Sequence, residues 1–309
     1  MKKVFNQIAI LILALTLINC SKNDDGDLTP VEQIGHQEQY TRLTSYSQNS
    51  KEYSLTYNAN GSIKNYEHFN YPGENSLANV EYDANNRIAK NGAFTYTYNS
   101  IGKISTILEV IGSTEIEYLL DYNPDGQLTA HTRYTTDGSR IHTQHKIKYN
   151  LNNQIAEINI YSLYSTPNYS KHSFTYDGLG NLVQDKNELS WENRNDYFES
   201  SRTRYTYDSK KNPIYGILYK SGLTNDFSVI NFKQMHSISA GYFYYYPPNN
   251  LVSLEVNSVG NPSNNYITTN YYFYNEDNLP TTMDYSKTKS NGETTLTENY
   301  KTWTYEIIE

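Results

Sequence analysis

The side chains that could do chemistry are few in type and widely scattered along the chain. The 309 residues include one cysteine, Cys20, and seven histidines. The sequence has no G-x-S-x-G, H-E-x-x-H, P-loop or dinucleotide-binding signature, so it shows no recognisable nucleophile, zinc or phosphate site. The 33 acidic residues could supply the paired carboxylates of a glycosidase, but acids on solvated strand faces explain them as well. We therefore expect no catalytic residue and no cofactor.

One group of histidines has a spacing worth testing as a metal site. If residues 137–138 form a two-residue hairpin turn, His131 lies opposite Gln144 and diagonally from His142. His145 then points to the opposite face of the sheet. Two histidines without a neighbouring acid make a poor zinc site, so we expect hydrogen-bonded surface histidines and no metal.

The N-terminal residues have the layout of a secretory signal. Two lysines precede an apolar run of eleven residues from Ile8 to Ile18, too short for the roughly twenty residues that a membrane-spanning helix needs. The run ends at Leu17-Ile18-Asn19-Cys20, which resembles the lipobox of bacterial lipoproteins, where the cysteine is lipidated and becomes the mature N-terminus. An ordinary signal peptide with a coincidental cysteine is the alternative. We expect a signal peptide over residues 1–19 and lipidation of Cys20.

Residues 20–38 have the composition of a lipid anchor followed by a flexible tether. Ser21 to Asp27 is polar, acidic and interrupted by glycine, and should therefore stay extended and solvated. Ser21 resembles the sorting position of outer-membrane lipoproteins, and the lysine followed by acids resembles the surface-export signal of Bacteroidota lipoproteins. These resemblances imply a lipid anchor in the outer membrane and exposure at the cell surface. The net charge of −8 argues against a nucleic-acid partner.

A seven-residue motif recurs about every 27 residues in the remaining domain, residues 39–309. It consists of Tyr, Asp or Asn, two variable residues, Gly or Asn, one variable residue and an aliphatic residue. Its tyrosine and its Gly or Asn are Tyr57 and Gly61, Tyr82 and Asn86, Tyr98 and Gly102, Tyr122 and Gly126, Tyr149 and Asn153, and Tyr176 and Gly180. Degenerate copies begin at Tyr207 and Tyr274, and Tyr245 to Leu251 is a candidate ninth copy.

Each position of the motif has a physical role in a β-hairpin turn. The Asp or Asn can hydrogen-bond the backbone two residues later and so starts the turn. The Gly or Asn three residues further tolerates the positive φ of a three-residue hairpin loop with a bulge. Lys211 is sterically disfavoured at that position, so the copy at Tyr207 should have a different turn.

Between the turns, aromatic and polar residues alternate, as in Tyr53-Leu55-Tyr57 and Phe94-Tyr96-Tyr98. This period is typical of antiparallel strands with one buried face. We predict an all-β fold, a long antiparallel meander of about 18–20 strands curled into an open or barrel-like sheet with tyrosines on its inner face. Whether the sheet closes depends on register and shear, which the pattern does not determine. A transmembrane barrel would need aliphatic side chains at every second position, where this chain has mostly tyrosine.

The Tyr-Asp-x-x-Gly-x-Leu/Ile unit resembles the YD repeat of RHS-type proteins. With the lipobox, such degenerate repeats also resemble a family of Bacteroidota lipoproteins that have a large porin-like antiparallel β-sheet. The resemblance covers about residues 40–309 and implies a fold but no activity. RHS repeats form a shell around a cargo domain, whereas only 35 strand-like residues follow Tyr274 here, so we expect no cargo domain.

These features predict a non-catalytic binding or interaction module whose partner is a polysaccharide or another envelope protein. Two stretches interrupt the repeat, and insertions on a repetitive scaffold often carry binding. The first stretch makes Trp191 a candidate ligand contact, and the aromatic run from Tyr242 to Tyr246, a candidate platform for stacking on sugars, adds Tyr244 and Tyr246. A glycan-acting enzyme, with an acidic pair and one raised pKa, is an alternative. A purely structural envelope component, with an exposed apolar patch or strand edge, is another.

Overall fold

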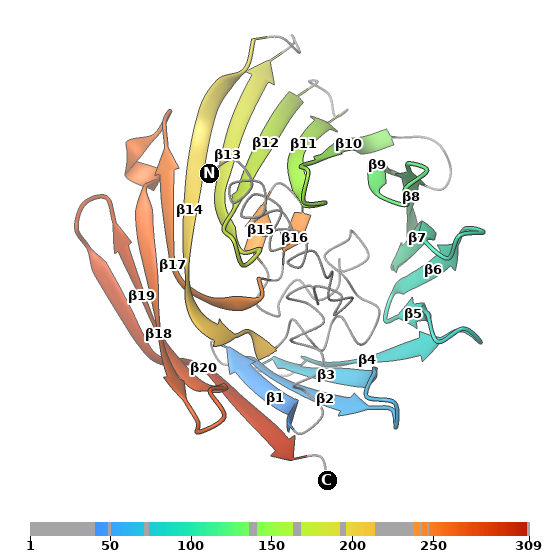
Figure 1. Cartoon of the computed structure of the whole chain (residues 1–309), viewed down its shortest axis with the longest axis horizontal. Coiled ribbons are helices and arrows are strands. Elements are labelled where there is room, and N and C mark those ends of the chain that lie inside the picture. The colour runs from blue at the N-terminus through green and yellow to red at the C-terminus, as the bar shows by residue number, and fades with distance from the viewer. Residues whose placement is uncertain are drawn as a thin grey trace, which may run out of the picture.

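The computed structural model describes residues 41–48, 51–70, 74–135, 141–162, 168–191, 196–213, 238–240, 243–245 and 247–307. The signal peptide, Cys20 and the tether, predicted for residues 1–38, lie outside the described residues. Eighteen strands form one antiparallel sheet, in which β1 pairs with both β2 and β20, so the sheet closes into a barrel (Figure 1). The prediction of an all-β antiparallel meander is confirmed, and the barrel-like alternative is the one that the chain adopts.

Strands that follow one another in the chain are neighbours in the barrel, except where β14 pairs with β17. The barrel strands are β1 (Thr41–Gln48), β2 (Lys51–Tyr57), β3 (Ile63–Asn70), β4 (Glu74–Tyr82), β5 (Ile88–Asn91), β6 (Phe94–Tyr98), β7 (Ile104–Ile111), β8 (Thr114–Tyr122), β9 (Leu128–Thr135), β10 (Ile141–Tyr149), β11 (Ile155–Ser162), β12 (Asn168–Tyr176), β13 (Leu182–Trp191), β14 (Phe198–Lys211), β17 (Asn249–Ser258), β18 (Tyr266–Tyr274), β19 (Pro280–Lys289) and β20 (Thr294–Ile307).

In the described part of the chain, β15, β16 and a 3₁₀ turn lie outside the barrel sheet. β15 (Ile238–Ala240) and β16 (Phe243–Tyr245) pair in a separate two-stranded sheet, and a 3₁₀ turn spans Pro262–Asn264. Among the described residues, no helix has the length and apolar character needed to cross a membrane.

The motif residues form hairpin turns with a repeated geometry. In the first copy, Asn58 N–H donates to the carbonyl of Ser62 at 2.8 Å, and Gly61 N–H donates to the carbonyl of Asn58 at 2.9 Å. The same two bonds recur in the other hairpin copies, with positive φ at Gly61 (+82°), Asn86 (+57°), Gly102 (+79°), Gly126 (+78°), Asn153 (+58°), Gly180 (+87°) and Asn278 (+60°). A further turn of this geometry, with Gly292 at +83°, follows Lys289, where no tyrosine motif marks it.

Most motif tyrosines link their turn to the turn before it. The hydroxyl groups of five of them donate to the backbone carbonyl of the residue that ends the preceding motif copy. Tyr57 and Tyr305 make bonds of the same kind, whereas Tyr274 donates to Asp208 Oδ2. The bonds to backbone carbonyls are Tyr57 to Leu43 (2.5 Å), Tyr82 to Ile63 (2.8 Å), Tyr98 to Ile88 (2.7 Å), Tyr122 to Ile104 (2.7 Å), Tyr176 to Ile155 (2.9 Å), Tyr207 to Leu182 (2.7 Å) and Tyr305 to Pro280 (2.8 Å). Tyr305 holds the tyrosine position in β20.

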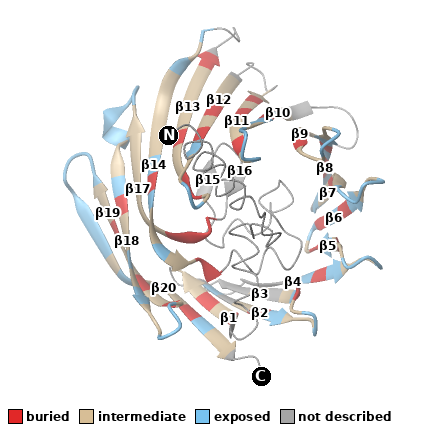
Figure 2. Ribbon diagram, in the orientation of Figure 1, coloured by how far each residue is buried: buried red, intermediate tan, exposed pale blue. Residues whose placement is uncertain are grey.

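The core lies on the inner face of the barrel wall. Along the barrel strands, buried residues recur between more exposed ones (Figure 2). Ile63, Ile107, Ile158 and Leu182 are fully buried, and motif tyrosines such as Tyr57 pack against them. Aromatic rings and aliphatic residues therefore share the burial, as expected for a chain rich in tyrosine and poor in other apolar residues.

The copy at Tyr207 has no hairpin turn of its own. β14 pairs with β17, which places Tyr207 opposite Leu251 in the register that Tyr57 and Ile63 have in the first copy. Along the chain, residues 212–248 thus connect β14 to β17, where the other copies have a short turn. The candidate ninth copy at Tyr245 is wrong, because Tyr245 lies in β16 and Leu251 completes the copy that starts at Tyr207.

Candidate functional site

Two histidines meet on the inner wall. His131 on β9 lies directly opposite His145 on β10, and their Nδ1 atoms are 2.8 Å apart. The rings stack with centroids 5.0 Å apart, and each residue is buried. The sequence-based pairing of His131 with Gln144 is therefore wrong, because the register shifts between Ile141 and Thr143.

This histidine pair is neutral at pH 7. One Nδ1 must donate and the other accept, so the two rings hold different tautomers. Burial, and to a smaller extent the neighbouring His172, lower the pKa of His145 to about 4. Burial, His145 and Arg133 together hold the pKa of His131 well below its usual value.

A second buried pair lies two strands further along the wall. His172 Nδ1 on β12 is 2.8 Å from Asp185 Oδ1 on β13, and buried Ile158 and Ile160 on β11 separate this pair from His145. Within the described part of the chain, no three residues among His, Cys, Asp and Glu are grouped so that they could hold a metal ion. Within each pair one side chain hydrogen-bonds the other, and we interpret both pairs as part of the wall.

A network of asparagines fixes both ends of the stretch that replaces the Tyr207 turn. Asp208 Oδ1 accepts the N–H groups of Lys210 (2.9 Å) and Asn250 (3.2 Å). In an intact turn the same oxygen takes the N–H groups two and four residues later, so Asn250 occupies the latter place. Asn181 and Asn249, both buried, exchange hydrogen bonds of 2.9 and 3.2 Å next to it.

Lys301 on β20 places an amine on the inner wall. It is opposite Met283 on β19, and its Nζ lies 6.0 Å from the ring centroid of Tyr300. Burial lowers the pKa of Lys301 to about 7, so near neutral pH the amine is divided between its charged and neutral forms.

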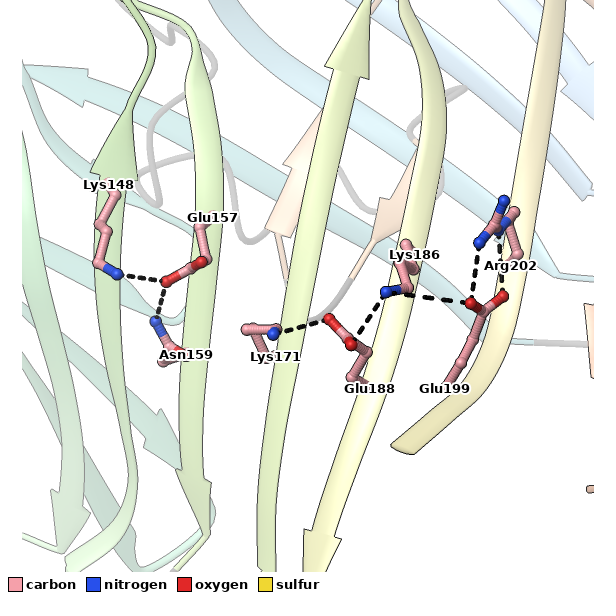
Figure 3. A network of polar contacts seen from close by, with 8 residues as sticks. All are labelled: Lys148, Glu157, Asn159, Lys171, Lys186, Glu188, Glu199 and Arg202. Carbon is pink, nitrogen blue, oxygen red and sulfur yellow. Dashed lines mark hydrogen bonds and ion pairs between the residues drawn. The ribbon is translucent and has the colours of Figure 1, made fainter. Parts of the chain in front are cut away.

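The outer face of β12–β14 carries a charged network. Lys171 and Lys186 both pair with Glu188, at 2.8 and 2.9 Å, and Arg202 pairs with Glu199 at 2.8 Å. Figure 3 shows this network and a smaller neighbouring one on β10 and β11, both from outside the barrel, with strands of the opposite wall behind. The smaller set joins Lys148, Glu157 and Asn159.

The outer face of β18–β20 has a different composition. Ile267, Tyr271 and Phe273 on β18 are 47%, 51% and 54% exposed, and Leu296 on β20 is 59% exposed. We call these four residues the apolar outer face. Hydroxyl side chains on β18 and β19 lie among them, namely Thr269, Thr282, Ser286 and Thr288. Asp284 lies opposite Tyr271, and its carboxylate accepts the N–H of Asn299 at 2.8 Å.

Two of the predicted ligand contacts lie in different sheets, and their role in binding stays a prediction. Trp191 is the last residue of β13, opposite Asn168, while Tyr244 pairs with Ser239 in the separate two-stranded sheet. Tyr246 lies outside the described residues. Sequence reasoning missed the apolar outer face, although the run Tyr271-Tyr272-Phe273-Tyr274 gives a signal. Four successive aromatic residues in a strand must place two rings on each face.

Comparisons with known proteins give similarity of fold only. No protein-family model matches the chain, and no curated protein matches it. A porin-like protein from Bacteroides uniformis ATCC 8492 has 14% identity and a TM-score of 0.42, with 86% of this chain and 96% of that chain covered. A porin-like protein from Bacteroides vulgatus ATCC 8482 has 12% identity and a TM-score of 0.40 over 86% and 99% of the chains. A TcdB2-TccC3-Cdc42 structure has 12% identity and a TM-score of 0.35, with 77% of this chain and 13% of that chain covered.

Proposed function

We propose that the protein is a lipid-anchored outer-membrane protein, exposed at the cell surface, that works as a non-catalytic interaction module. A polysaccharide or another envelope protein is its partner. Cys20 at the end of a short apolar run supports the anchor. The observation that carries the proposal is the polarity of the barrel wall, which fits a domain held beside a membrane.

Over β10–β14 the wall is buried on its inner face and charged on its outer face. Buried Ile158 and Phe174 face inward on the same strands that carry the ion pairs of Glu157 and Lys171 outward. A lysine or arginine on the lipid-facing side of a transmembrane barrel costs about 2–4 kcal/mol at the bilayer midplane. This face therefore suits water, and the lipid at Cys20 would supply the membrane attachment.

The alternative of a glycan-acting enzyme needs a carboxyl group with a raised pKa to serve as the acid. Among the described residues, the carboxyl groups with a resolved shift all have a lowered pKa; they are Asp83, Glu157, Glu188, Glu255 and Glu293. At Glu188 burial raises the pKa, but Lys171 and Lys186 outweigh it. These acids are arranged as ion-pair partners, which favours the interaction module.

The test of the anchor is the Cys20→Ala variant expressed in a bacterium that processes lipoproteins. We expect the wild-type protein to partition into outer membranes and to be cleaved by protease added to intact cells. The variant should leave the membrane fraction. A variant that still partitions into membranes, or a wild-type protein that protease does not reach, would contradict the proposal.

The test of the interaction module is chemical cross-linking on intact cells beside a thermal-shift screen of the purified protein against polysaccharides. A ligand at a hundred times its Kd adds about 2.7 kcal/mol of stability. A saturable shift or a specific cross-linked partner is expected. A turnover of any screened glycan by the protein would instead favour the enzyme.

A further inference from the structure

The apolar outer face presents four large apolar side chains to solvent on β18 and β20 of the described outer wall. Phe273 and Tyr271 each expose about half of their surface, and both point outward from the same strand. The charged network on β12–β14, in contrast, already pairs its own groups. Exposed apolar patches with a polar surround mark interaction sites on soluble surfaces.

The spacing of the side chains suits a chain of sugar rings. Tyr271 and Phe273 are two residues apart on β18, so their rings project from positions roughly 7 Å apart. Thr282 lies opposite Phe273, and Asp284 lies opposite Tyr271. Apolar C–H faces of a sugar can stack on the rings, while its hydroxyl groups reach the threonine hydroxyl and the carboxylate.

The charge of the apolar outer face and of the whole protein determines which class of polysaccharide this face can bind. The acid at this face is Asp284, and Glu255, which lies opposite Ile267, is paired with Arg204 at 3.4 Å. The protein as a whole has a formal net charge of −8. An acidic polysaccharide or an anionic membrane surface would be repelled, whereas an uncharged glycan would not.

Area argues against a second copy of the chain as the occupant. Each half-exposed side chain of the apolar outer face offers roughly 100 Å², or about 400 Å² for the four together. A stable dimer buries about 800 Å² on each partner. The net charge of −8 on each copy would oppose self-association as well.

We propose that the outer face of β18–β20 binds an uncharged polysaccharide, with Tyr271 and Phe273 as the stacking residues. The inference rests on the proposed function and names its ligand class and its site. Asp284 accepts hydrogen bonds from sugar hydroxyl groups, and Ile267 and Leu296 extend the contact along and across the strands.

The experiment is native affinity electrophoresis of the full chain, purified in detergent, in gels that contain one soluble polysaccharide. Xyloglucan, galactomannan, laminarin and dextran are the uncharged probes, and polygalacturonate and alginate are the acidic ones. We expect at least one uncharged glycan to retard the protein and neither acidic glycan to do so. Replacing both rings, Tyr271→Ala with Phe273→Ala, should weaken that retardation about tenfold or more.

Two controls separate stacking from folding. Phe198→Ala on β14 removes another half-exposed phenylalanine and should leave the retardation unchanged. Tyr271→Phe keeps the ring and should retain most of the binding. Sedimentation velocity of the wild type should show one copy of the chain per particle, because a dimer through this face would compete with the glycan.

The outcomes distinguish the site from the function. Glycan binding that survives the double ring replacement overturns the site and leaves the interaction module in place. Retardation by acidic glycans alone overturns the charge argument. If no polysaccharide retards the protein, or if the double replacement dissociates a dimer, the inference fails, and the cross-linking test still judges the proposed function.

Discussion

The burial of Lys301 lowers the stability of the folded protein at neutral pH. The pKa of this lysine is about 7 in the barrel and near 10.5 in the unfolded chain, so between these values the unfolded chain binds a proton that the folded protein does not. Stability should therefore rise as the pH rises from 7 to 10. Lys301→Met, next to Met283, should stabilise the fold by about 2–4 kcal/mol at pH 7. Urea denaturation at pH 7 and pH 10 checks this, with a smaller gain at pH 10; destabilisation at both would contradict it.

The histidine pair should make the barrel sensitive to acid. The pKa of His145 falls from 6.5 in the unfolded chain to about 4 in the barrel, because its charged form is buried. As the pH falls from 6.5 towards 4, the unfolded chain takes up the proton first and stability is lost. The loss from His145 should be about 3 kcal/mol.

The control for this acid sensitivity is the double variant His131→Leu with His145→Leu. It removes both rings together, so that no Nδ1 atom remains without its histidine partner. The variant should lose much less stability over the same range of pH. Denaturation at pH 6.5, 5.5 and 4.5 measures the difference. Equal slopes for the wild type and the double variant would show that other groups cause the effect.

At the scale of the hairpin, the positive φ of the turn is the feature most open to test. Gly126 has φ of +78°, and a Cβ added there would meet Lys103 Cε at 3.5 Å, an ordinary contact. Gly126→Val should therefore cost about 1–3 kcal/mol through backbone strain alone. Gly126→Asn should cost less, because asparagine holds this position at Asn86. Gly178→Val is the control, since Gly178 lacks positive φ and has open space around it.

The tyrosine that links successive turns gives a second test. Tyr122→Phe removes the 2.7 Å hydrogen bond to the carbonyl of Ile104 and should cost about 1 kcal/mol in chemical denaturation. Tyr271→Phe on the outer face is the matched control, and its hydroxyl removal should leave stability unchanged. Equal effects of the two replacements would show that the turn-to-turn bond contributes nothing.

The hairpins are the part of the fold that is best predicted from the sequence. The signals for a hairpin lie within a few residues of one another in sequence: a turn glycine, the aspartate before it, and an alternation such as Phe94, Tyr96 and Tyr98. One copy of the motif is therefore enough to predict a hairpin. The register between β9 and β10 is not local, because it depends on a bulge after Ile141. Without that shift the pattern placed His131 and His145 on opposite faces. The contact between these two histidines therefore could not be predicted from the sequence.

At the scale of the whole molecule, the closure of the barrel also could not be predicted from the sequence. Closure requires the strands at the two ends of the described chain to pair, and no residue pattern in either strand specifies its partner. The same limit applies to the apolar outer face, because its threonines and rings come from β18, β19 and β20. Its aromatic run was visible in the sequence, but the polar residues that turn it into a ligand platform appear only once the register is known.

Closure itself can be tested through β1 and β20. Ser47 and Thr302 lie opposite each other, with their hydroxyl oxygens 2.7 Å apart and the two residues 255 positions apart in sequence. Ser47→Cys with Thr302→Cys should form a disulfide in the folded protein, and a loop of this length should add about 5 kcal/mol of stability. Ser47→Cys with Thr294→Cys is the control, because Thr294 lies at the far end of β20 and should not cross-link. Non-reducing gel electrophoresis and urea denaturation with and without reductant read the result. A sheet that stays open in solution would give no cross-link in either variant, because only closure holds the ends of this meander together.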